Sequence, residues 1–344
     1  MAQKVIVTGG CGFIGSHTIT DLVAEGFEVI SIDSMERADP RVLDGLEAIT
    51  GKKIKNYQIN LTDRLATLEV FKEHSDAVGV IHFAAYKSVS ESVSKPLEYY
   101  RNNMNSLYNV LEGIEVSGIH AFIFSSSCSV YGDVETLPVS EETPLNEVQC
   151  PYARTKKHAE EVVRDFMVAF PRHHSVLLRY FNPVGAHPSA HIGETPIEVP
   201  NNLVPFITQT AIGRREKLTV FGNDYDTRDG SCIRDYIHVM DIAHAHTLAL
   251  QKVLSGEISD KVSLLNIGSG NGTTVLEAIK AFEKVSGKPL SYEIGPRRSG
   301  DIPAVYANNE KARKVLGWEI QFSLDDMMSS AWAWEQEMKR RAYY

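Results

Sequence analysis

Short apolar, β-branched runs alternate with longer helix-like segments through the first half of the chain. The run KVIVT at residues 4–8 predicts a first strand, and a helical pattern follows from about Ile14 to Glu25. Further runs predict strands at 28–33, 54–59, 78–83, 121–125 and 175–179, and a long helix follows Pro96 and ends near Gly118. Near-continuous apolar strands that alternate with helices indicate a parallel sheet covered on both faces. We therefore expect an α/β fold with a doubly wound parallel sheet of the Rossmann type.

The rhythm changes at about Asn182. Pro and Gly become frequent, as in NPVGAHPS and GETPIEVPNN, the apolar runs shorten, and helical patterns gather toward the C-terminus. We interpret this part as a smaller C-terminal α/β lobe that closes over a ligand. The expected division is 1–181 for the sheet domain and 182–344 for the lobe, and segments of the lobe are free to return to the first domain.

Composition narrows the classes of partner. The 344 residues carry a formal net charge of −9, which argues against binding to nucleic acid or to an anionic membrane surface. The four cysteines form no CxxC pair and fit no zinc spacing, so we expect free thiols in a reducing compartment and no metal site. Since no apolar run approaches the ~20 residues that span a bilayer and no signal peptide pattern precedes the first strand, we expect a cytoplasmic protein.

A glycine-rich turn, TGGCGFIG, follows the first predicted strand directly. Glycines at positions 9, 12 and 15 let the backbone turn tightly and approach a pyrophosphate, and the N-terminus of the next helix offers free N–H groups to it. Asp33 closes the second strand 18 residues after Gly15, where a carboxylate accepts the ribose hydroxyls of NAD and repels the 2′-phosphate of NADP. Arg37 lies nearby and would soften this discrimination, but NAD is the cofactor that we expect.

Tyr152 and Lys156 are four residues apart after Pro151, a residue that suits the first turn of a helix, so both side chains are expected on one helical face. One ammonium ~4 Å from a phenol, at an effective dielectric near ~20, supplies about the 4 kcal/mol needed to move a tyrosine pKa from ~10 toward ~7. The pair is a credible general base beside a nicotinamide. Ser127 ends a serine cluster that runs off the fifth strand, where its hydroxyl would bond the reacting alcohol and pass a proton toward Tyr152.

The glycine turn, the serine cluster and YxxxK together resemble the extended short-chain dehydrogenases/reductases, and within them the UDP-galactose 4-epimerase family. The resemblance spans nearly the whole chain, and its most specific segments include IHFAAYK at 81–87, LRYFNPVGAHP at 178–188, PNNL at 200–203, RDYIHVMD at 234–241 and PRRSGDIP at 296–303. It implies interconversion of UDP-galactose and UDP-glucose by oxidation at C4 with NAD, rotation of the 4-keto sugar and hydride return to its opposite face. It also implies a homodimer formed through the helix after Pro96 and the helix that holds Tyr152.

The resemblance assigns further site residues. Those implied to line the NAD site are Gly9, Gly12, Phe13, Ile14, Gly15, Asp33, Ser34, Asn60, Leu61, Phe83, Ala84, Ala85, Lys87, Asn102, Ser125, Tyr152, Lys156 and Phe181. Those implied to hold the UDP-sugar are Lys87, Ser127, Tyr152, Asn182, Asn202, Leu203, Phe221, Arg234, Arg298, Asp301 and Val305.

Three positions depart from the family pattern. Ser34 stands where the family usually has Asn, and Asn60 stands where an Asp normally meets the adenine. Val305 occupies a pocket-wall position at which Tyr excludes N-acetylated sugars and a small residue admits them. We therefore expect UDP-N-acetylglucosamine and UDP-N-acetylgalactosamine to be substrates as well, unless a neighbour such as Tyr306 refills the space.

Other functions fit the residues less well. A nucleotide-sugar 4,6-dehydratase of the same family carries an Asp-Glu pair just after the serine or threonine, and this chain has Cys128 and Ser129 there. UDP-uronate epimerases would differ only in the sugar pocket. A non-catalytic NAD-sensing protein would keep the glycine loop and tend to lose the Tyr-Lys pair, whereas this chain retains both.

Overall fold

A seven-stranded parallel sheet forms the centre of the larger domain. The computed structural model describes residues 2–196, 200, 202–298 and 301–344. The strands lie in the order β10-β6-β5-β4-β1-β2-β3, and every neighbouring pair is parallel. Their bounds are β1 (Lys4–Thr8), β2 (Glu28–Ile32), β3 (Lys55–Tyr57), β4 (Ala77–His82), β5 (Ala121–Ser127), β6 (His174–Tyr180) and β10 (Val262–Ile267). The predicted doubly wound α/β fold is confirmed.

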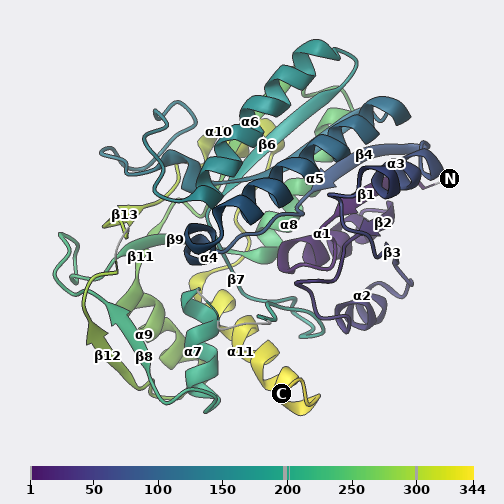
Figure 1. The fold of residues 1–344 in the computed structure, drawn as a ribbon. Helices are drawn as coiled ribbons and strands as arrows, with labels where there is room; N and C mark the ends of the chain where they lie inside the picture. Colours follow the sequence, from purple (N-terminus) through teal and green to yellow (C-terminus); the bar gives the residue numbers. More distant parts are fainter. Residues whose placement is uncertain (1, 197–199, 201, 299–300) are drawn as a thin grey trace.

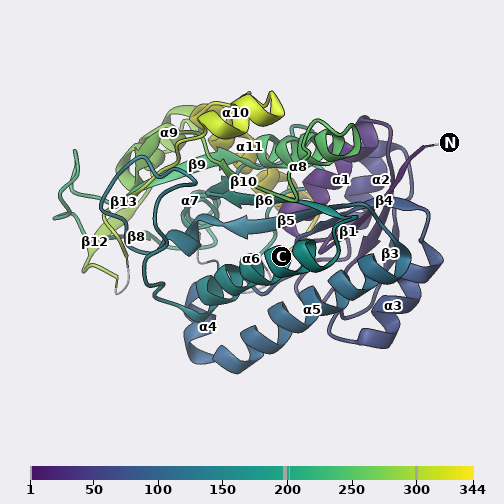
Figure 2. The ribbon, with the colours of Figure 1, turned by 90° about the horizontal axis from the view of Figure 1, so that it is seen from above.

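Helices cover both faces of this sheet (Figure 2). Successive side chains of a strand point to opposite faces, so Val5 and Val7 pack into one apolar cluster and Ile6 packs into the other. The helices over the first face are α1 (Phe13–Ala24), α2 (Val42–Thr50), α8 (Val239–Leu254) and α10 (Glu310–Leu316). Those over the second face are α3 (Arg64–Glu73), α5 (Pro96–Ser117) and α6 (Pro151–Ala169).

The predicted helix boundaries follow local chemistry. Proline occupies the first turn of both α5 and α6, where its missing N–H costs nothing. Helix α5 ends at Gly118, whose φ of +71° is the left-handed conformation that terminates helices and that glycine adopts without strain. The long helix predicted after Pro96 is therefore confirmed at both ends.

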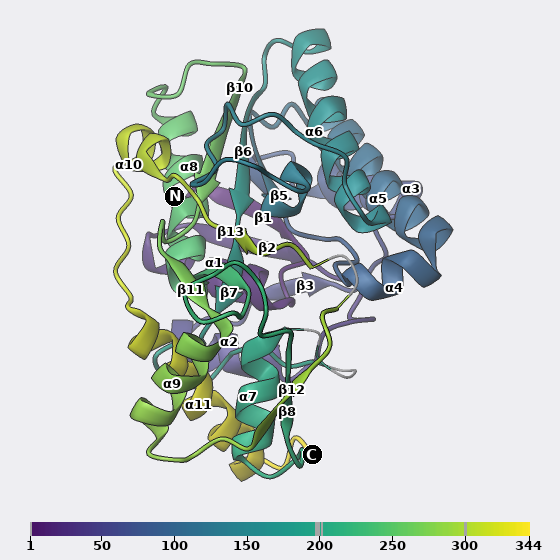
Figure 3. The ribbon, with the colours of Figure 1, turned by 90° about the vertical axis from the view of Figure 1, so that its left-hand side faces the viewer.

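The smaller lobe packs beside the carboxyl edge of the large sheet (Figures 1 and 3). It contains two small sheets, one of β7 (Asn182–Val184), β9 (Ile233–His238), β11 (Gly272–Thr274) and β13 (Ala304–Val305), the other of β8 (Leu218–Phe221) and β12 (Tyr292–Gly295). Its helices are α7 (Leu203–Ala211), α9 (Val275–Ser286) and α11 (Leu324–Arg340). Phe282 and Trp332 meet edge to face in its core.

Two elements of the second half return to the large domain. Helix α8 packs against α1, and β10 extends the parallel sheet beyond β6. The division at residue 181 thus marks where the smaller lobe begins, while residues 239–267 contribute mainly to the sheet domain, and the division as a domain boundary stays a prediction. Residues 197–199, 201 and 299–300, which belong to the segments GETPIEVPNN, PNNL and PRRSGDIP, lie outside the described residues.

The sheet places its ligand-binding edge between β1 and β4. The chain proceeds from β1 to β2 and β3 on one side, and then crosses over to β4, β5 and β6 on the other. At such a reversal the connections diverge and leave a crevice at the carboxyl ends of the strands. Two short helical elements lie beside this crevice: α4 (Val89–Ser94) and the 3₁₀ turn at Cys128–Tyr131. In the part of the chain that the structure describes, no helix is both long and apolar enough to cross a membrane.

Candidate active site

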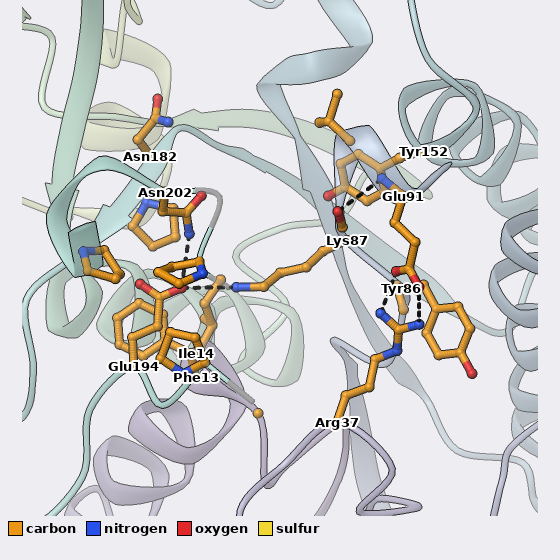
Figure 4. A pocket seen from close by; sticks show the side chains of 18 of the residues that line it. Phe13, Ile14, Arg37, Tyr86, Lys87, Glu91, Tyr152, Asn182, Glu194 and Asn202 are labelled. Atoms are coloured by element: carbon orange, nitrogen blue, oxygen red, sulfur yellow. Dashed lines mark hydrogen bonds and ion pairs between the residues drawn. The ribbon is translucent and has the colours of Figure 1, made fainter. Parts of the chain in front are cut away.

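A cleft of about 1720 Å³ lies at this carboxyl edge, between the large sheet and the smaller lobe (Figure 4). A pocket for one small ligand measures roughly 300–1000 Å³, so this cleft has room for two. It brings together every site residue proposed from the sequence except Ser125, Ser127 and Phe181. These three lie in the wall behind the cleft and are at most 8% exposed.

The glycine turn between β1 and α1 has the shape of a dinucleotide cradle. Gly9 has a φ of +68°, and a Cβ there would lie 2.7 Å from the backbone nitrogen of Ala84. A Cβ on Gly15 would collide with the carbonyl oxygen of Gly9. Because Gly12, the N-cap of α1, has no side chain, the first-turn N–H groups remain available to an anionic ligand at the positive end of the helix. The turn fits a pyrophosphate.

Asp33 is held at the end of β2 by backbone donors. Its two carboxylate oxygens accept from the N–H groups of Cys11 at 3.0 Å and Met35 at 2.9 Å. Burial raises the pKa of Asp33, and these donors oppose that effect. A carboxylate fixed beside the glycine turn is the group that accepts the ribose hydroxyls of NAD, so the residues present fit this cofactor.

The amide oxygen of Asn60 was expected to face an adenine, but it is already engaged. It accepts from the backbone N–H of Thr62 at 3.0 Å and from the Thr62 hydroxyl at 2.8 Å. The Asn60 nitrogen donates to the carboxylate of Glu36 at 3.1 Å. The residue thus lines the cleft as part of a network that the sequence pattern did not reveal.

Tyr152 and Lys156 enter the cleft from the first turns of α6, as the four-residue spacing predicted. Both are nearly buried, with exposed fractions of 7% and 4%. The Lys156 ammonium donates to the carbonyl oxygen of Ser125 at 2.7 Å and lies 4.9 Å from the centre of the Phe124 ring. Ser127 ends β5 beside this pair, and its hydroxyl accepts from the backbone N–H of Ser129 at 3.2 Å.

The expected depression of the Tyr152 pKa by Lys156 is not found. Burial raises the pKa of Tyr152 well above its ordinary value, the neighbouring Tyr180 raises it further, and the nearby Ser127 hydroxyl lowers it in part. Burial also lowers the pKa of Lys156 to about 8, an effect that Glu160 opposes. The spacing to Lys156 predicts a lowered pKa only for a phenol that stays in water. The folded chain buries the Tyr152 phenol, and the Lys156 ammonium donates to the carbonyl oxygen of Ser125.

A buried ion pair supports the catalytic face of α6. Glu160 follows Lys156 by one turn and accepts from Arg179 of β6 at 2.8 and 2.6 Å and from the Ser126 hydroxyl at 2.5 Å. Removing one partner of such a pair leaves an uncompensated buried charge, which costs about 3–5 kcal/mol. The pair therefore fixes the position of α6 on the sheet.

Two arginines converge at the other end of the cleft. Arg298 donates to both oxygens of Asp301, at 3.1 and 2.8 Å, and its guanidinium lies 5.7 Å from the Phe221 ring centre. Arg234 donates to the carbonyl of Ile302 at 2.9 Å and lies 3.5 Å from Asp301. Planar guanidinium groups bind pyrophosphate oxygens in bidentate fashion, so this end suits the nucleotide.

The wall around Val305 is apolar. Val305 is 7% exposed and packs with Val130, Tyr131 and Phe181, which explains why Phe181 lies behind the cleft instead of lining it. The ring of Tyr306 faces Gly272 of β11, since successive residues of a strand point to opposite sides. Tyr306 therefore does not refill the space beside Val305. Ser125 likewise points away, and its hydroxyl pairs with His246 at 2.8 Å.

Glu194 is a cleft residue that the sequence patterns did not indicate. Its carboxylate accepts from the Asn202 amide at 2.9 Å and from the Lys87 ammonium at 3.3 Å (Figure 4). Its carbonyl oxygen accepts from the Trp334 indole at 3.0 Å. Lys87 belongs to the sheet domain and the other three residues to the smaller lobe, so Glu194 links the two sides. Among the described residues, no group of three or more His, Cys, Asp or Glu side chains is placed to hold a metal ion.

Comparison with known proteins agrees with this geometry. The family model described as GDP-mannose 4,6 dehydratase matches residues 6–331. UDP-glucose 4-epimerase from Bacillus subtilis is 45% identical over 97% of each chain. The crystal structure of UDP-glucose 4-epimerase from Bifidobacterium longum, in complex with NAD⁺ and UDP, is 44% identical with a TM-score of 0.92 over 97% of this chain and 98% of that one. The UDP-Glc/GlcNAc 4-epimerase from Campylobacter jejuni is 35% identical with a TM-score of 0.84 over 98% and 100%.

The fold, the glycine turn and the Tyr-Lys pair define an NAD-dependent epimerase/dehydratase of the extended short-chain dehydrogenase/reductase class. Within that class, the chain belongs to the UDP-glucose 4-epimerase family.

Proposed function

We propose that this chain interconverts UDP-galactose and UDP-glucose with Tyr152 as the acid–base residue. The observation that carries the proposal is the meeting, in one cleft, of the Tyr152–Lys156 pair, the dinucleotide turn and the converging arginines Arg234 and Arg298. NAD, held by the glycine turn and Asp33, would supply the hydride acceptor and donor for oxidation and reduction at C4 of the sugar. The chain itself must move a proton, hold the nucleotide and exclude water.

Tyr152 takes the C4 hydroxyl proton, and Ser127 assists by hydrogen bonding to the phenol. To accept that proton, Tyr152 must be a phenolate. Burial makes ionisation of the phenol costly, so the phenolate requires positive charge nearby. The Lys156 ammonium, with a pKa of about 8, is charged at neutral pH. Arg234 and Arg298 anchor the UDP at the far end while the sugar turns. Affinity therefore resides in the nucleotide and not in the sugar.

The matching family model is named for a 4,6-dehydratase. The side chains that follow Ser127 argue against that reaction in this chain. They are those of Cys128 and Ser129, which line the cleft, and burial raises the pKa of the Cys128 thiol to about 12. A thiol that holds its proton so firmly and a hydroxyl cannot act as the acid and base that remove water. The epimerase reaction needs neither group.

The test is direct. Purified protein is incubated with UDP-galactose and no added cofactor, and UDP-glucose is followed by a coupled UDP-glucose dehydrogenase assay. We expect turnover without added dinucleotide, because the cycle regenerates NAD, and we expect NAD⁺ or NADH to be released when the protein is denatured. Protein that contains its dinucleotide and yet forms no UDP-glucose would overturn the proposal.

The substrate range extends to N-acetylated UDP-sugars. Val305 lines the cleft from β13, directly beside Arg234 in the sheet register, and Tyr306 faces away from it. A valine leaves more room than a tyrosine for an acetamido group at C2. The C. jejuni relative, a UDP-Glc/GlcNAc 4-epimerase, supports this breadth.

The chain forms a homodimer through α5 and α6. These helices pack side by side on the outside of the molecule (Figure 1). Leu97 and Tyr108, three turns apart on the outward face of α5, are 65% and 47% exposed, and Val168 of α6 is 79% exposed. Large apolar side chains on two adjacent helices form the kind of surface that a second copy covers.

A further inference from the structure

The connection between β2 and α2 places a second carboxylate next to Asp33. Glu36 lines the same cleft as Asp33, and its carboxylate accepts from the Asn60 amide and from the Tyr86 hydroxyl, each at 3.1 Å. The charge of Glu36 raises the pKa of Asp33, so the two carboxylates interact. The ribose end of the cleft therefore carries more negative charge than Asp33 alone provides.

Arg37, the next residue, is fully paired. Its guanidinium donates to both carboxylate oxygens of Glu91, at 2.6 and 2.9 Å, and lies 3.9 Å from the centre of the Tyr86 ring (Figure 4). Glu91 also accepts from the Tyr99 hydroxyl at 2.8 Å and from the Lys95 ammonium at 3.3 Å. Both terminal nitrogens of the Arg37 guanidinium are thus engaged by the Glu91 carboxylate.

We propose that Glu91 and Glu36 set the preference of this cleft for NAD over NADP, Glu91 by sequestering Arg37 and Glu36 by adding a carboxylate beside Asp33. NADP differs from NAD by a phosphate on the ribose that the acid at the end of β2 binds, and a nearby arginine is the group that accommodates this phosphate. Arg37 stands four residues after Asp33 and lines the same cleft, so it would serve this role if it were free. Its planar fork binds either a carboxylate or a phosphate, and Glu91 already occupies it.

The experiment measures which dinucleotide the holoprotein holds. Native protein and variants are equilibrated with equal, excess concentrations of NAD and NADP, and the bound dinucleotides are separated by chromatography after denaturation. We expect Glu91→Gln to raise the bound NADP:NAD ratio about tenfold, the effect of one hydrogen bond to a charged group. Glutamine keeps an acceptor for Tyr99 while it removes the charge that neutralises Arg37. Glu36→Gln should raise the ratio independently.

A double variant identifies the cause. In Arg37→Gln/Glu91→Gln the bound NADP:NAD ratio should return to the native value, because the guanidinium that binds the added phosphate is absent. Glu112→Gln is the matched control, since Glu112 pairs with Arg64 in a similar exposed bidentate contact outside the cleft, and its ratio should equal the native one. An unchanged ratio in both Glu91→Gln and Glu36→Gln, or a double variant that keeps the gain, overturns the proposal. Because the readout is binding, the result does not depend on epimerase turnover.

Discussion

Tyr152 presents a buried phenol next to Ser127 and one helical turn before Lys156. Replacing Tyr152 by Phe removes the proton-accepting oxygen and changes the cleft volume little, so we expect kcat for UDP-galactose to fall by at least ~10²-fold. The Kd for UDP should change little, because we expect Arg234 and Arg298, and not Tyr152, to bind the nucleotide. Steady-state kinetics and UDP titration check both parts. Turnover near the native value would remove Tyr152 from the mechanism.

The side chain of Val305 limits how much space the sugar pocket offers. Val305→Tyr fills the space beside Arg234, and overpacking a filled pocket typically costs about 1–3 kcal/mol. We expect kcat/KM for UDP-N-acetylgalactosamine to fall about 10–100-fold while kcat/KM for UDP-galactose changes little. Comparing both substrates on both proteins makes each enzyme its own control. A native enzyme without acetylated turnover would defeat this expectation and leave the epimerase assignment intact.

At the element scale, the outward face of α5 carries apolar side chains that the core does not use. Tyr108→Glu places a charge in the middle of that face, and desolvating a lone carboxylate in an interface is costly. By light scattering we expect the native protein to be a dimer and the variant, at the same concentration, to be a monomer. Tyr292→Glu on β12, with a similar exposed fraction of 45%, is the control and should stay dimeric. A dimeric Tyr108→Glu protein would place the interface elsewhere.

At the scale of the whole molecule, four buried histidines make stability depend on pH. Burial lowers the pKa of His17 and His82 to about 3 and that of His238 and His246 to about 4. Between those values and ~6.5 the unfolded chain binds these protons and the folded chain does not, so stability is present above ~6.5 and is lost as the pH falls. Asp241, whose pKa burial raises to about 6, opposes this by one proton.

Unfolding lets these histidines take up protons, which predicts a fall in the free energy of unfolding toward acid pH. Each histidine contributes at most ~1.4 kcal/mol per pH unit to that slope. Urea unfolding at pH 7 and pH 5 measures this slope, and His246→Gln should reduce it by about one proton's share. Equal unfolding free energies at the two pH values would contradict the prediction.

Features that depend on neighbours along the chain are readable from the amino-acid sequence. Glycine spacing defines the turn after β1, Pro96 and Gly118 define the ends of α5, and the four-residue step places Tyr152 and Lys156 on one face of α6. Apolar runs and the helices between them were enough to predict the parallel sheet. These signals are readable because backbone conformation and helix periodicity are local properties.

The pairing of distant charges, and the effect of burial on their pKa values, emerge once the chain has folded. Arg37 meets Glu91 across 54 positions and Lys87 meets Glu194 across 107, and no periodicity encodes either contact. The pairing of β10 with β6 at the edge of the large sheet is likewise a long-range contact that local patterns do not encode. The raised pKa of Tyr152 reverses the expectation from its spacing to Lys156, because desolvation depends on everything packed around the phenol and a pairwise distance does not measure it.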